Sequence, residues 1–454
     1  MGRIALIGDN SVEYINALID IWNLNCCAVL LDWRIPFSMI YRMMLDADVK
    51  ICYIDKKVYD KIDPIFHHGI KYIVFENLEN NARILPNEVR AKYCSRYDKK
   101  EAVIFYSSGT TGKSKGIILT HYAISTNADS IIDYMRPCPE DCLYIAKSLS
   151  HSSTLTGELL VALKSGSSII IAPTIVPPRF VFENIIQYHV TIICLNPTLA
   201  SLYANEYSHN KYSGLTLRTI YVSGSILNDN VYNFVHRIFD GIAVYNVYGL
   251  SEAGPRVAAQ RVGCCKGNSV GKAIKDVQVV IVDNYGNVLQ NECRGIIHVN
   301  TPSRYKKYVK GKSKHKSLYN GWLNTGDIGY IDLNNELHIV DRIDDVIIID
   351  SHKIYPHDVE RQIMLCTGIA ECAVVKIANE ERALIACLYV SKRNHDEIRQ
   401  QLKNALLTYE IPHFFLRADE LPLNINKKRD LFQIKKILED GFRQQEKKIK
   451  PHNR

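Results

Sequence analysis

Short apolar runs alternate with longer amphipathic stretches through the first half of the chain. The runs are Ile4–Ile7, Cys27–Leu31, Leu143–Ala146, Ser168–Ile171, Ile192–Leu195 and Thr219–Val222. After the first run, Asn10-Ser11 precedes a segment in which Tyr14, Leu18 and Ile21 repeat at helical spacing. Because strands that alternate with helices form parallel sheets with helices packed on their faces, this pattern predicts an α/β fold.

The pattern changes after about residue 267. Val277–Val282 and Gly295–Val299 flank turn residues and read as antiparallel hairpins, and Leu337–Val340 is one more strand. Helical patterns follow at His357–Leu365 and Asp396–Thr408. We therefore predict a large N-terminal domain at 1–341, made of mixed sheets flanked by helices plus a small β region. A hinge at 342–346 would join it to a small mobile α+β domain at 347–454.

A loop rich in glycine and hydroxyl residues separates two apolar, strand-like runs, Val103–Tyr106 and Ile117–Thr120. Its residues are Ser107, Ser108, Gly109, Thr110, Thr111, Gly112, Lys113, Ser114 and Lys115. Glycines let a backbone approach a ligand closely, and hydroxyl and ammonium donors suit a polyphosphate. The segment therefore predicts a phosphate-binding loop.

The same loop partly matches the Walker A pattern of P-loop NTPases. Gly112-Lys113-Ser114 fits the end of that pattern, but Ser107 stands where its first glycine is required. A Walker loop also runs directly into a helix, whereas the extended run Ile117–Thr120 follows here. We therefore place the loop between two strands.

Composition narrows the class of protein. With 454 residues, 47% hydrophobic and 23% charged, the chain has the balance of a globular protein with two or three domains. The net charge of +8 is concentrated at Lys427–Arg429 and in Arg443–Arg454, which we expect to be a solvated end rather than a nucleic-acid surface. The thirteen cysteines lack the spacing of a disulfide framework or a zinc site, which favours reduced thiols and a cytoplasmic location. No apolar run is long enough for a membrane span.

Further polar segments follow the phosphate loop in a fixed order. They are Tyr-Asn-Val-Tyr-Gly-Leu-Ser-Glu at 245–252, Gly-Trp-Leu-Asn-Thr-Gly-Asp at 321–327, Asp-Arg-Ile-Asp-Asp at 341–345 and Asn-Ile-Asn-Lys-Lys-Arg at 424–429. Together with 106–121, they resemble the motifs of the adenylate-forming superfamily, which includes acyl-CoA synthetases, nonribosomal-peptide adenylation domains and firefly luciferase. The resemblance extends over essentially the whole chain.

The resemblance implies a role for each motif in an enzyme that uses ATP and Mg²⁺. The loop at 107–115 would hold the β- and γ-phosphates, with Gly224 and Gly249 also at the nucleotide. Tyr248 would stack on adenine, Ser251 would contact the α-phosphate, and Glu252 would be the metal ligand. Asp327 would bind the ribose, with Arg342 as a second nucleotide contact. Asp344 would be the hinge and Lys428 the catalytic lysine.

The resemblance also locates an acyl pocket. Its expected residues are His151, Ser223, Ser225, Val247, Ala253 and Gly254. His151 stands where amino-acid-activating members place an aspartate for the substrate ammonium, and a histidine cannot supply that fixed negative charge. This favours a carboxylic acid without an α-amine. Arg256 is expected at the edge of the pocket, where it would favour a second acidic group.

Three positions depart from the family pattern. Asp350-Ser351-His352-Lys353 replaces a glycine-containing loop beside the pantetheine tunnel, which makes the thioester step less secure than adenylation. Asn426-Lys427 replaces the common Asn-Gly before the catalytic lysine, and Asp341 replaces a glycine.

The leading hypothesis is an AMP-forming ligase that joins a carboxylic acid to a thiol through acyl-AMP, with release of pyrophosphate. The acceptor would be CoA or the phosphopantetheine of a separate acyl or peptidyl carrier protein. One alternative is a stand-alone enzyme that activates an amino acid. A second is a degenerate, non-catalytic member that acts as a binding protein. A third, a Walker-type ATPase or kinase, would release phosphate rather than pyrophosphate.

Overall fold

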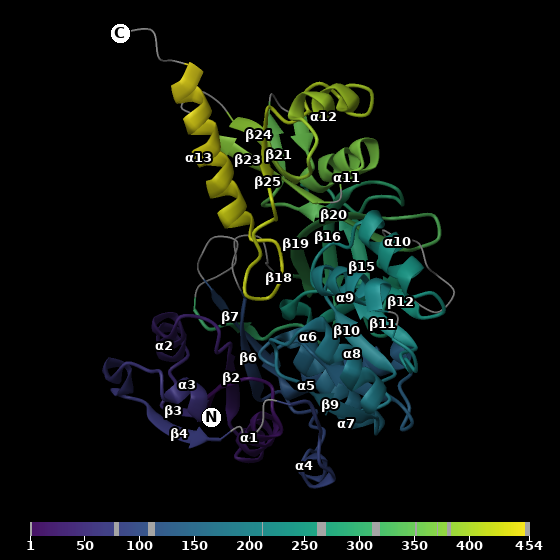
Figure 1. Cartoon of the computed structure of the whole chain (residues 1–454). Helices are drawn as coiled ribbons and strands as arrows, with labels where there is room; N and C mark the ends of the chain where they lie inside the picture. Colours follow the sequence, from purple (N-terminus) through teal and green to yellow (C-terminus); the bar gives the residue numbers. More distant parts are fainter. Residues whose placement is uncertain are drawn as a thin grey trace.

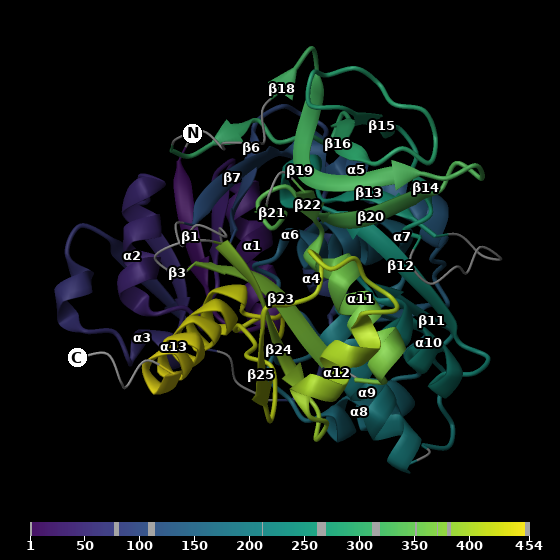
Figure 2. The ribbon, with the colours of Figure 1, turned by 90° about the horizontal axis from the view of Figure 1, so that it is seen from above.

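The computed structural model describes residues 2–76, 81–107, 114–210, 212–260, 269–310, 318–349, 352–369, 371–378 and 383–449. A large N-terminal part carries a small C-terminal part on one end (Figure 1). Seen from above, the sheet and helices of the small part lie over the large part (Figure 2). The expected division into a large domain of mixed sheets and a small C-terminal domain is confirmed.

The first sheet of the large domain has seven strands in the order β17-β7-β6-β2-β1-β3-β4. The strands are β1 (Arg3–Ile7), β2 (Cys27–Leu31), β3 (Ile51–Asp55), β4 (Lys71–Phe75), β6 (Glu101–Ser107), β7 (Lys115–Thr120) and β17 (Lys307–Tyr308). Its helical segments are α1 (Val12–Asn23), α2 (Phe37–Asp46), α3 (Lys56–Tyr59), η1 (Pro64–His67) and α4 (Asn87–Ala91). The five strands from β6 to β4 are parallel, whereas β7 runs antiparallel to β6.

The second sheet has eight strands in the order β14-β13-β12-β11-β10-β8-β9-β5. They are β5 (Arg83–Ile84), β8 (Cys142–Ile145), β9 (Ser168–Ile171), β10 (Ile192–Leu195), β11 (Thr219–Val222), β12 (Ala243–Gly249), β13 (Arg256–Ala259) and β14 (Lys272–Ala273). The helical segments are α5 (His121–Met135), α6 (Ser152–Thr154), the π-helix η2 (Leu155–Leu160), α7 (Val161–Ser165), α8 (Pro178–Gln187), α9 (Pro197–Asn210), α10 (Asp229–Ile238) and η3 (Ser251–Ala253). One apolar core includes residues of both sheets and of α1 and α5, so it joins the two halves of the large domain.

A third sheet and the small domain complete the chain. The third sheet contains β15 (Gln278–Val282), β16 (Gly295–Asn300), β18 (Leu318–Tyr319), β19 (Trp322–Ile331) and β20 (Leu337–Arg342). The small domain contains β21 (Ile347–Ile349), β22 (His352–Ile354), α11 (Pro356–Thr367), β23 (Glu371–Ala378), β24 (Ala383–Val390), α12 (His395–Leu402), β25 (Phe414–Ala418) and α13 (Leu431–Ile449). Separate cores involve α11 and α12 on one side and α13 on the other.

One expectation about the C-terminal region was wrong. The predicted helix Asp396–Thr408 is shorter, because α12 ends at Leu402 and the chain then turns back, with the Glu410 carboxylate accepting a 2.9 Å hydrogen bond from the Leu407 backbone nitrogen. The expected solvated end at Arg443–Arg454 includes the last turns of α13, which reaches Ile449, and Arg443 is exposed there. Ile434 and Leu438 of this helix are fully buried, so the apolar face of α13 packs on the small sheet.

A buried ion pair fixes the loop before α13 to the small-domain core. Glu360 of α11 is 4% exposed, and its carboxylate accepts hydrogen bonds from Arg429 Nη1 at 2.7 Å and from the Val374 backbone nitrogen at 2.9 Å. The loop therefore follows the small domain in any rigid-body rotation.

Replacing Arg429 with methionine should leave the buried Glu360 carboxylate without its cation and lower the local stability of the small domain by about 2 kcal/mol. Hydrogen exchange of the β23 amides in the full chain measures this change. Arg361→Met is the matched control, because Arg361 makes a partly exposed 3.2 Å ion pair with Asp229. Equal effects of the two substitutions would contradict the anchoring role.

Candidate active site

The phosphate loop connects two antiparallel strands. Tyr106 lies opposite Gly116 and Ser107 opposite Lys115, so both ends of the loop are at the carboxyl end of β6. Ser108, Gly109, Thr110, Thr111, Gly112 and Lys113 lie outside the described residues. The strand–loop–strand context is the predicted one, and it differs from the strand–loop–helix context of a Walker loop.

Three predicted nucleotide contacts meet between β12, β19 and β20. The Tyr248 hydroxyl donates a 2.5 Å hydrogen bond to Asp327 Oδ2, and Arg342 Nε lies 3.3 Å from Asp327 Oδ1. Burial and the nearby Asp327 charge raise the pKa of Tyr248 well above its usual value, so the phenol remains a donor. The three side chains are therefore held in one polar network before any ligand is bound.

The segment after β12 brings Ser251 and Glu252 to the same region. Ser251 Oγ lies 2.7 Å from Ser152 Oγ. Glu252 is 4% exposed, and its Oε1 accepts a 3.0 Å hydrogen bond from the Tyr308 hydroxyl. A buried carboxylate close to β7, the strand that follows the predicted phosphate loop, fits Mg²⁺, which binds proteins through one or two carboxylates together with substrate phosphates.

Two glycines allow this turn to close. A Cβ at Gly249 would lie 2.1 Å from the Pro255 carbonyl oxygen, and one at Gly254 would lie 2.4 Å from the Ser303 carbonyl oxygen. Gly254 also has φ of 95°. Close packing of the backbone therefore requires glycine at both predicted site positions.

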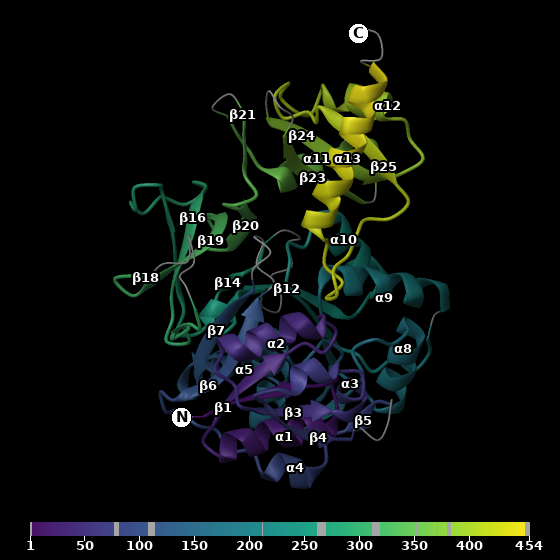
Figure 3. The same cartoon turned by 90° about the vertical axis from the view of Figure 1, so that its left-hand side faces the viewer.

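The predicted catalytic lysine reaches from the small domain to the large domain. The loop between β25 and α13 points toward the large domain (Figures 1 and 3). A Cβ built on Gly224, whose φ is 99°, would lie only 3.2 Å from Lys428 Nζ. Burial, Lys147 and Arg342 together lower the pKa of Lys428 to about 8. The structure thus brings Lys428 close to Gly224 and into the electrostatic range of Arg342.

Asn426 docks this loop on the large domain. Its side-chain Oδ1 accepts hydrogen bonds from His151 Nε2 at 2.8 Å and Arg34 Nη2 at 2.9 Å, and its carbonyl accepts one from Asn196 Nδ2 at 2.9 Å. Arg34 Nη1 also donates to the Ile425 carbonyl at 2.9 Å. Arg34 and Asn196 were missed in the sequence, because neither belongs to a recognisable motif.

His151 is neutral at ordinary pH. Burial, Lys428 and Arg34 lower its pKa to about 4, against the opposing effects of Asn426 and Asp32. Because Asn426 Oδ1 can only accept, the proton of the imidazole is on Nε2. The sequence predicted His151 in the acyl pocket, and the structure directs its Nε2 to the lysine loop.

The other expected pocket residues lie just after β11, in β12 or in the turn that follows β12. Val247, Ala253 and Ser223 are buried, Ser225 is exposed, and Ser223 Oγ has no hydrogen-bond partner in the described part of the chain. Arg256 was expected at the edge of the pocket, but it is only 2% exposed. Because β13 pairs with β12, Arg256 directly follows the turn that contains Ala253 and Gly254, and its side chain is buried within the large domain.

Each departure from the family pattern has a structural counterpart. Lys427 adopts a left-handed backbone with φ of 54°, a conformation that glycine would adopt without strain. Asp341 is fully buried, and its carboxylate accepts from the His357 backbone nitrogen and lies 3.1 Å from His357 Nδ1. His352 stacks on Tyr409 with ring centroids 4.0 Å apart, whereas Asp350 and Ser351 lie outside the described residues. Asp344, the predicted hinge, is exposed in the turn after β20.

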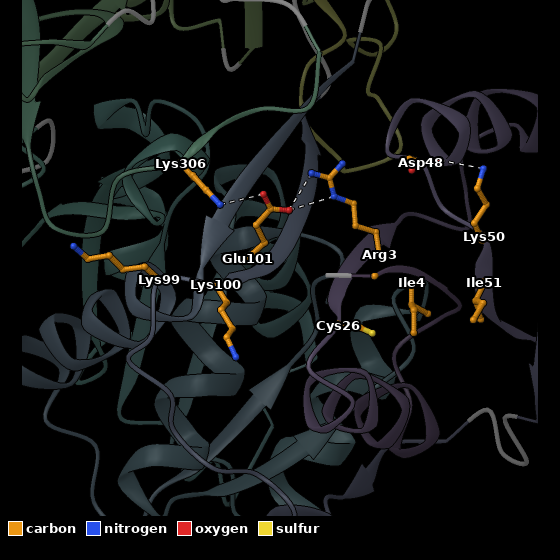
Figure 4. Close-up of a pocket in the computed structure, with 11 residues that line it drawn as sticks. Arg3, Ile4, Cys26, Asp48, Lys50, Ile51, Lys99, Lys100, Glu101 and Lys306 are labelled. Carbon is orange, nitrogen blue, oxygen red and sulfur yellow. Dashed lines mark hydrogen bonds and ion pairs between the residues drawn. The ribbon is translucent and has the colours of Figure 1, made fainter.

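A separate hollow of about 800 Å³ lies away from this site (Figure 4). It is lined at the amino ends of β1, β3 and β6, opposite the phosphate loop. Its Glu101 carboxylate is already paired with Arg3 at 3.0 Å and Lys306 at 3.3 Å. We therefore assign the chemistry to the cleft and not to this hollow.

Comparison with known proteins identifies the family. Residues 2–309 match the AMP-binding enzyme family, and residues 358–428 match the AMP-binding enzyme C-terminal domain. A 2-succinylbenzoate–CoA ligase of Bacillus cytotoxicus is 25% identical over 96% of this chain and 89% of its own. ATP-bound MatB of Rhodopseudomonas palustris is similar in structure, with a TM-score of 0.87 and 22% identity over 97% of this chain and 89% of its own.

The O-succinylbenzoate coenzyme A synthetase of Bacillus subtilis, in complex with ATP and magnesium, has a TM-score of 0.80 and 23% identity, again over 97% of this chain and 89% of its own. The chain belongs to the AMP-binding enzyme family. The class expected from the sequence, AMP-forming acid–thiol ligases, is confirmed at the level of the family. In the described part of the chain, no helix has the length and apolar character of a membrane span.

The strained position of Lys427 gives a stability test. Lys427→Gly should keep the free energy of unfolding within about 1 kcal/mol, because relief of strain offsets the greater freedom of the unfolded chain. Lys427→Val should be less stable than Lys427→Gly by about 1–2 kcal/mol, because a β-branched residue tolerates positive φ poorly. Urea denaturation followed by circular dichroism compares the two. Equal stability would show that the left-handed geometry is not retained.

Proposed function

We propose that the protein activates a carboxylic acid with ATP, giving acyl-AMP and pyrophosphate, and then transfers the acyl group to a thiol. The observation that carries this proposal is the entry of Lys428 from the small domain into the cleft beside Gly224 and near Arg342. The acid–CoA ligase among its relatives supports the same class of reaction.

The cleft residues have separable roles in the first step. Tyr248, Asp327 and Arg342 would bind the nucleoside, and Ser251 would orient the α-phosphate. A carboxylate oxygen of the acid attacks the α-phosphorus, a new P–O bond forms, and the bond to the bridging oxygen of pyrophosphate breaks. Both reactants are anionic, so charge repulsion and alignment dominate the barrier.

Lys428 would act on that charge. Its ammonium donates to the oxygens on which negative charge develops, and a donor aimed in a water-poor cleft is worth more than one in water. Glu252 would hold Mg²⁺, which supplies neutralisation of the phosphate charge when bound. Tyr308, which donates to Glu252, would fix the orientation of that carboxylate.

In the second step a thiol would attack the acyl carbon of acyl-AMP, so that a C–S bond forms, the bond from that carbon to the phosphate oxygen breaks, and AMP and the thiol proton leave. We propose CoA or the phosphopantetheine of a separate carrier protein as acceptor, with rotation of the small domain about Asp344 between the steps. His352 and its stack on Tyr409 lie where the family pattern led us to expect the tunnel. A cytoplasmic location remains a prediction, supported by the free thiols of all the described cysteines.

A neutral His151 argues against an amino-acid substrate. The imidazole donates to Asn426 and carries no negative charge to pair with an α-ammonium group. We therefore propose an acid without an α-amine.

Lys428→Ala should lower acid-dependent ATP–pyrophosphate exchange by about 10²–10³-fold, the usual effect of removing one aimed donor. Binding of ATP, measured by titration calorimetry, should weaken far less. Lys435→Ala is the control, because Lys435 is an exposed lysine on α13. Near-normal exchange in Lys428→Ala would refute the lysine assignment, and absence of exchange with any aliphatic, aryl or amino acid in the native chain would refute the proposed function.

The pH dependence of kcat/KM tests the protonation state of Lys428. Since the pKa of Lys428 in the free protein is lowered to about 8, its ammonium is lost as pH rises through that value. The kcat/KM for ATP, which reports the free enzyme, should therefore fall above about pH 8. Lys428→Arg should remove this limb even if its rate is lower, because guanidinium stays protonated. An unchanged limb in Lys428→Arg would assign it to another group.

A further inference from the structure

Arg256 is a buried cation whose backbone is fixed on both sides. Its backbone nitrogen donates to Asn127 Oδ1 at 2.9 Å, and Asn127 Nδ2 donates to its carbonyl at 3.0 Å. Asn127 is itself fully buried on α5. The position of this guanidinium is therefore set by the core of the large domain rather than by solvent.

The guanidinium has unused donors. Arg256 Nε and Nη2 are buried, and neither has a hydrogen-bond partner in the described part of the chain. These two nitrogens form one edge of the guanidinium, which is the arrangement that binds a carboxylate with two parallel hydrogen bonds. A buried donor without a partner is costly, so an unpaired edge of this kind indicates a ligand.

The helical turn that faces the Arg256 side chain has a glycine at the point of contact. Gly157 lies in the π-helix η2, and a Cβ there would be 2.9 Å from Arg256 Nη2. π-helical turns are rare and are found often at functional sites. Tyr134 of α5 also interacts with Arg256, but burial raises its pKa to about 12, so it supplies no negative charge.

The charges around this helical turn do not balance. Glu158 of η2 is 1% exposed and pairs with Lys147 Nζ at 2.9 Å. Arg256 interacts with the same carboxylate at longer range, without an ion pair in the described part of the chain. Lys428 adds a further cation near Lys147. The Glu158 carboxylate therefore faces two cations, Lys147 and Arg256.

The position of Arg256 places this excess of positive charge next to the residues expected in the acyl pocket. Arg256 lies opposite Gly249 across the β12–β13 pair, and Ala253 and Gly254 are in the turn between them. Ser152, which contacts Ser251, begins the helical stretch that continues into η2. The unpaired edge therefore belongs to a residue that directly follows the turn with the expected pocket residues Ala253 and Gly254.

We propose that the substrate is a dicarboxylic acid whose second carboxylate is bound by Arg256, with Lys147 contributing to the favourable field. This rests on the proposed function of the cleft. A monocarboxylic acid of the same size would leave the donor edge unpaired and the positive charge uncompensated. Sites built to hydrogen-bond a substrate group discriminate strongly against analogues that lack it.

Matched pairs of acids test the proposal in the full chain. ATP–pyrophosphate exchange is measured with malonate, succinate, glutarate, adipate and the isomeric benzenedicarboxylates, each beside its monomethyl ester. At least one diacid should exceed its ester by about 10²-fold or more in kcat/KM. Equal use of diacids and esters would overturn the proposal while leaving acid adenylation intact. Absence of exchange with every acid would refute the proposed function and this inference together.

Arg256→Met separates binding from folding. It should abolish the preference by raising KM for the diacid, while exchange with the monomethyl ester stays within about threefold and reports a folded enzyme, and Arg256→Lys should restore part of the preference. If Arg256→Met does not fold, Gly157→Ala takes its place, because its Cβ would displace Nη2 and should reduce the preference at least tenfold. A diacid preference that survives both substitutions would show that another group binds the second carboxylate.

Discussion

The arrangement of the two domains depends on one constraint, which is that the partly exposed Lys428 lies close to other cations. Lys428 enters a region that already contains Lys147 and Arg342, and its lowered pKa records the cost of charge there. Docking is held instead by polar contacts of Asn426 with His151, Arg34 and Asn196. A polyphosphate would supply the missing negative charge, so nucleotide binding and domain docking should favour each other.

The departures from the family pattern preserve the geometry of the lysine loop by other means. Lys427, just before the lysine, takes the left-handed conformation that a glycine would take. Arg429, just after the lysine, pairs with Glu360. Asp341 ties β20 to the start of α11 through His357. Burial opposes the charge of His357, but Glu360 and Asp341 raise its pKa to about 9. Protonated His357 therefore stabilises the folded protein. This contribution to the free energy of unfolding is fully present below the ordinary histidine pKa of about 6.5 and is lost as pH rises through about 9.

Local signals in the sequence were sufficient for much of the fold. The apolar runs at Ile4–Ile7 and Cys27–Leu31 became paired parallel strands, because a short β-branched run has few other ways to be buried. The phosphate loop was placed correctly between strands by the extended run that follows it. The polar motifs predicted Tyr248, Asp327 and Arg342, which the structure joins in one network.

Long-range contacts explain what the sequence did not reveal. Arg34 and Asn426 are far apart in the chain and meet only because the small domain docks on the large one. Burial of Arg256 depends on the pairing of β12 with β13 and on the glycine in η2, neither of which has a local signature. The packing of Ile434 and Leu438 on the small sheet stabilises α13, and this long-range contact is not evident from its basic, polar sequence alone.

We propose that Lys428 is a partly buried cation whose charge is balanced when a polyphosphate binds. Its pKa can be measured in the full chain from the pH dependence of acetylation by acetic anhydride, with the modified peptide quantified by mass spectrometry. We expect a pKa near 8 for the free protein and a clear rise when ATP and Mg²⁺ are added. A pKa at the ordinary lysine value of about 10.4, unchanged by nucleotide, would contradict it.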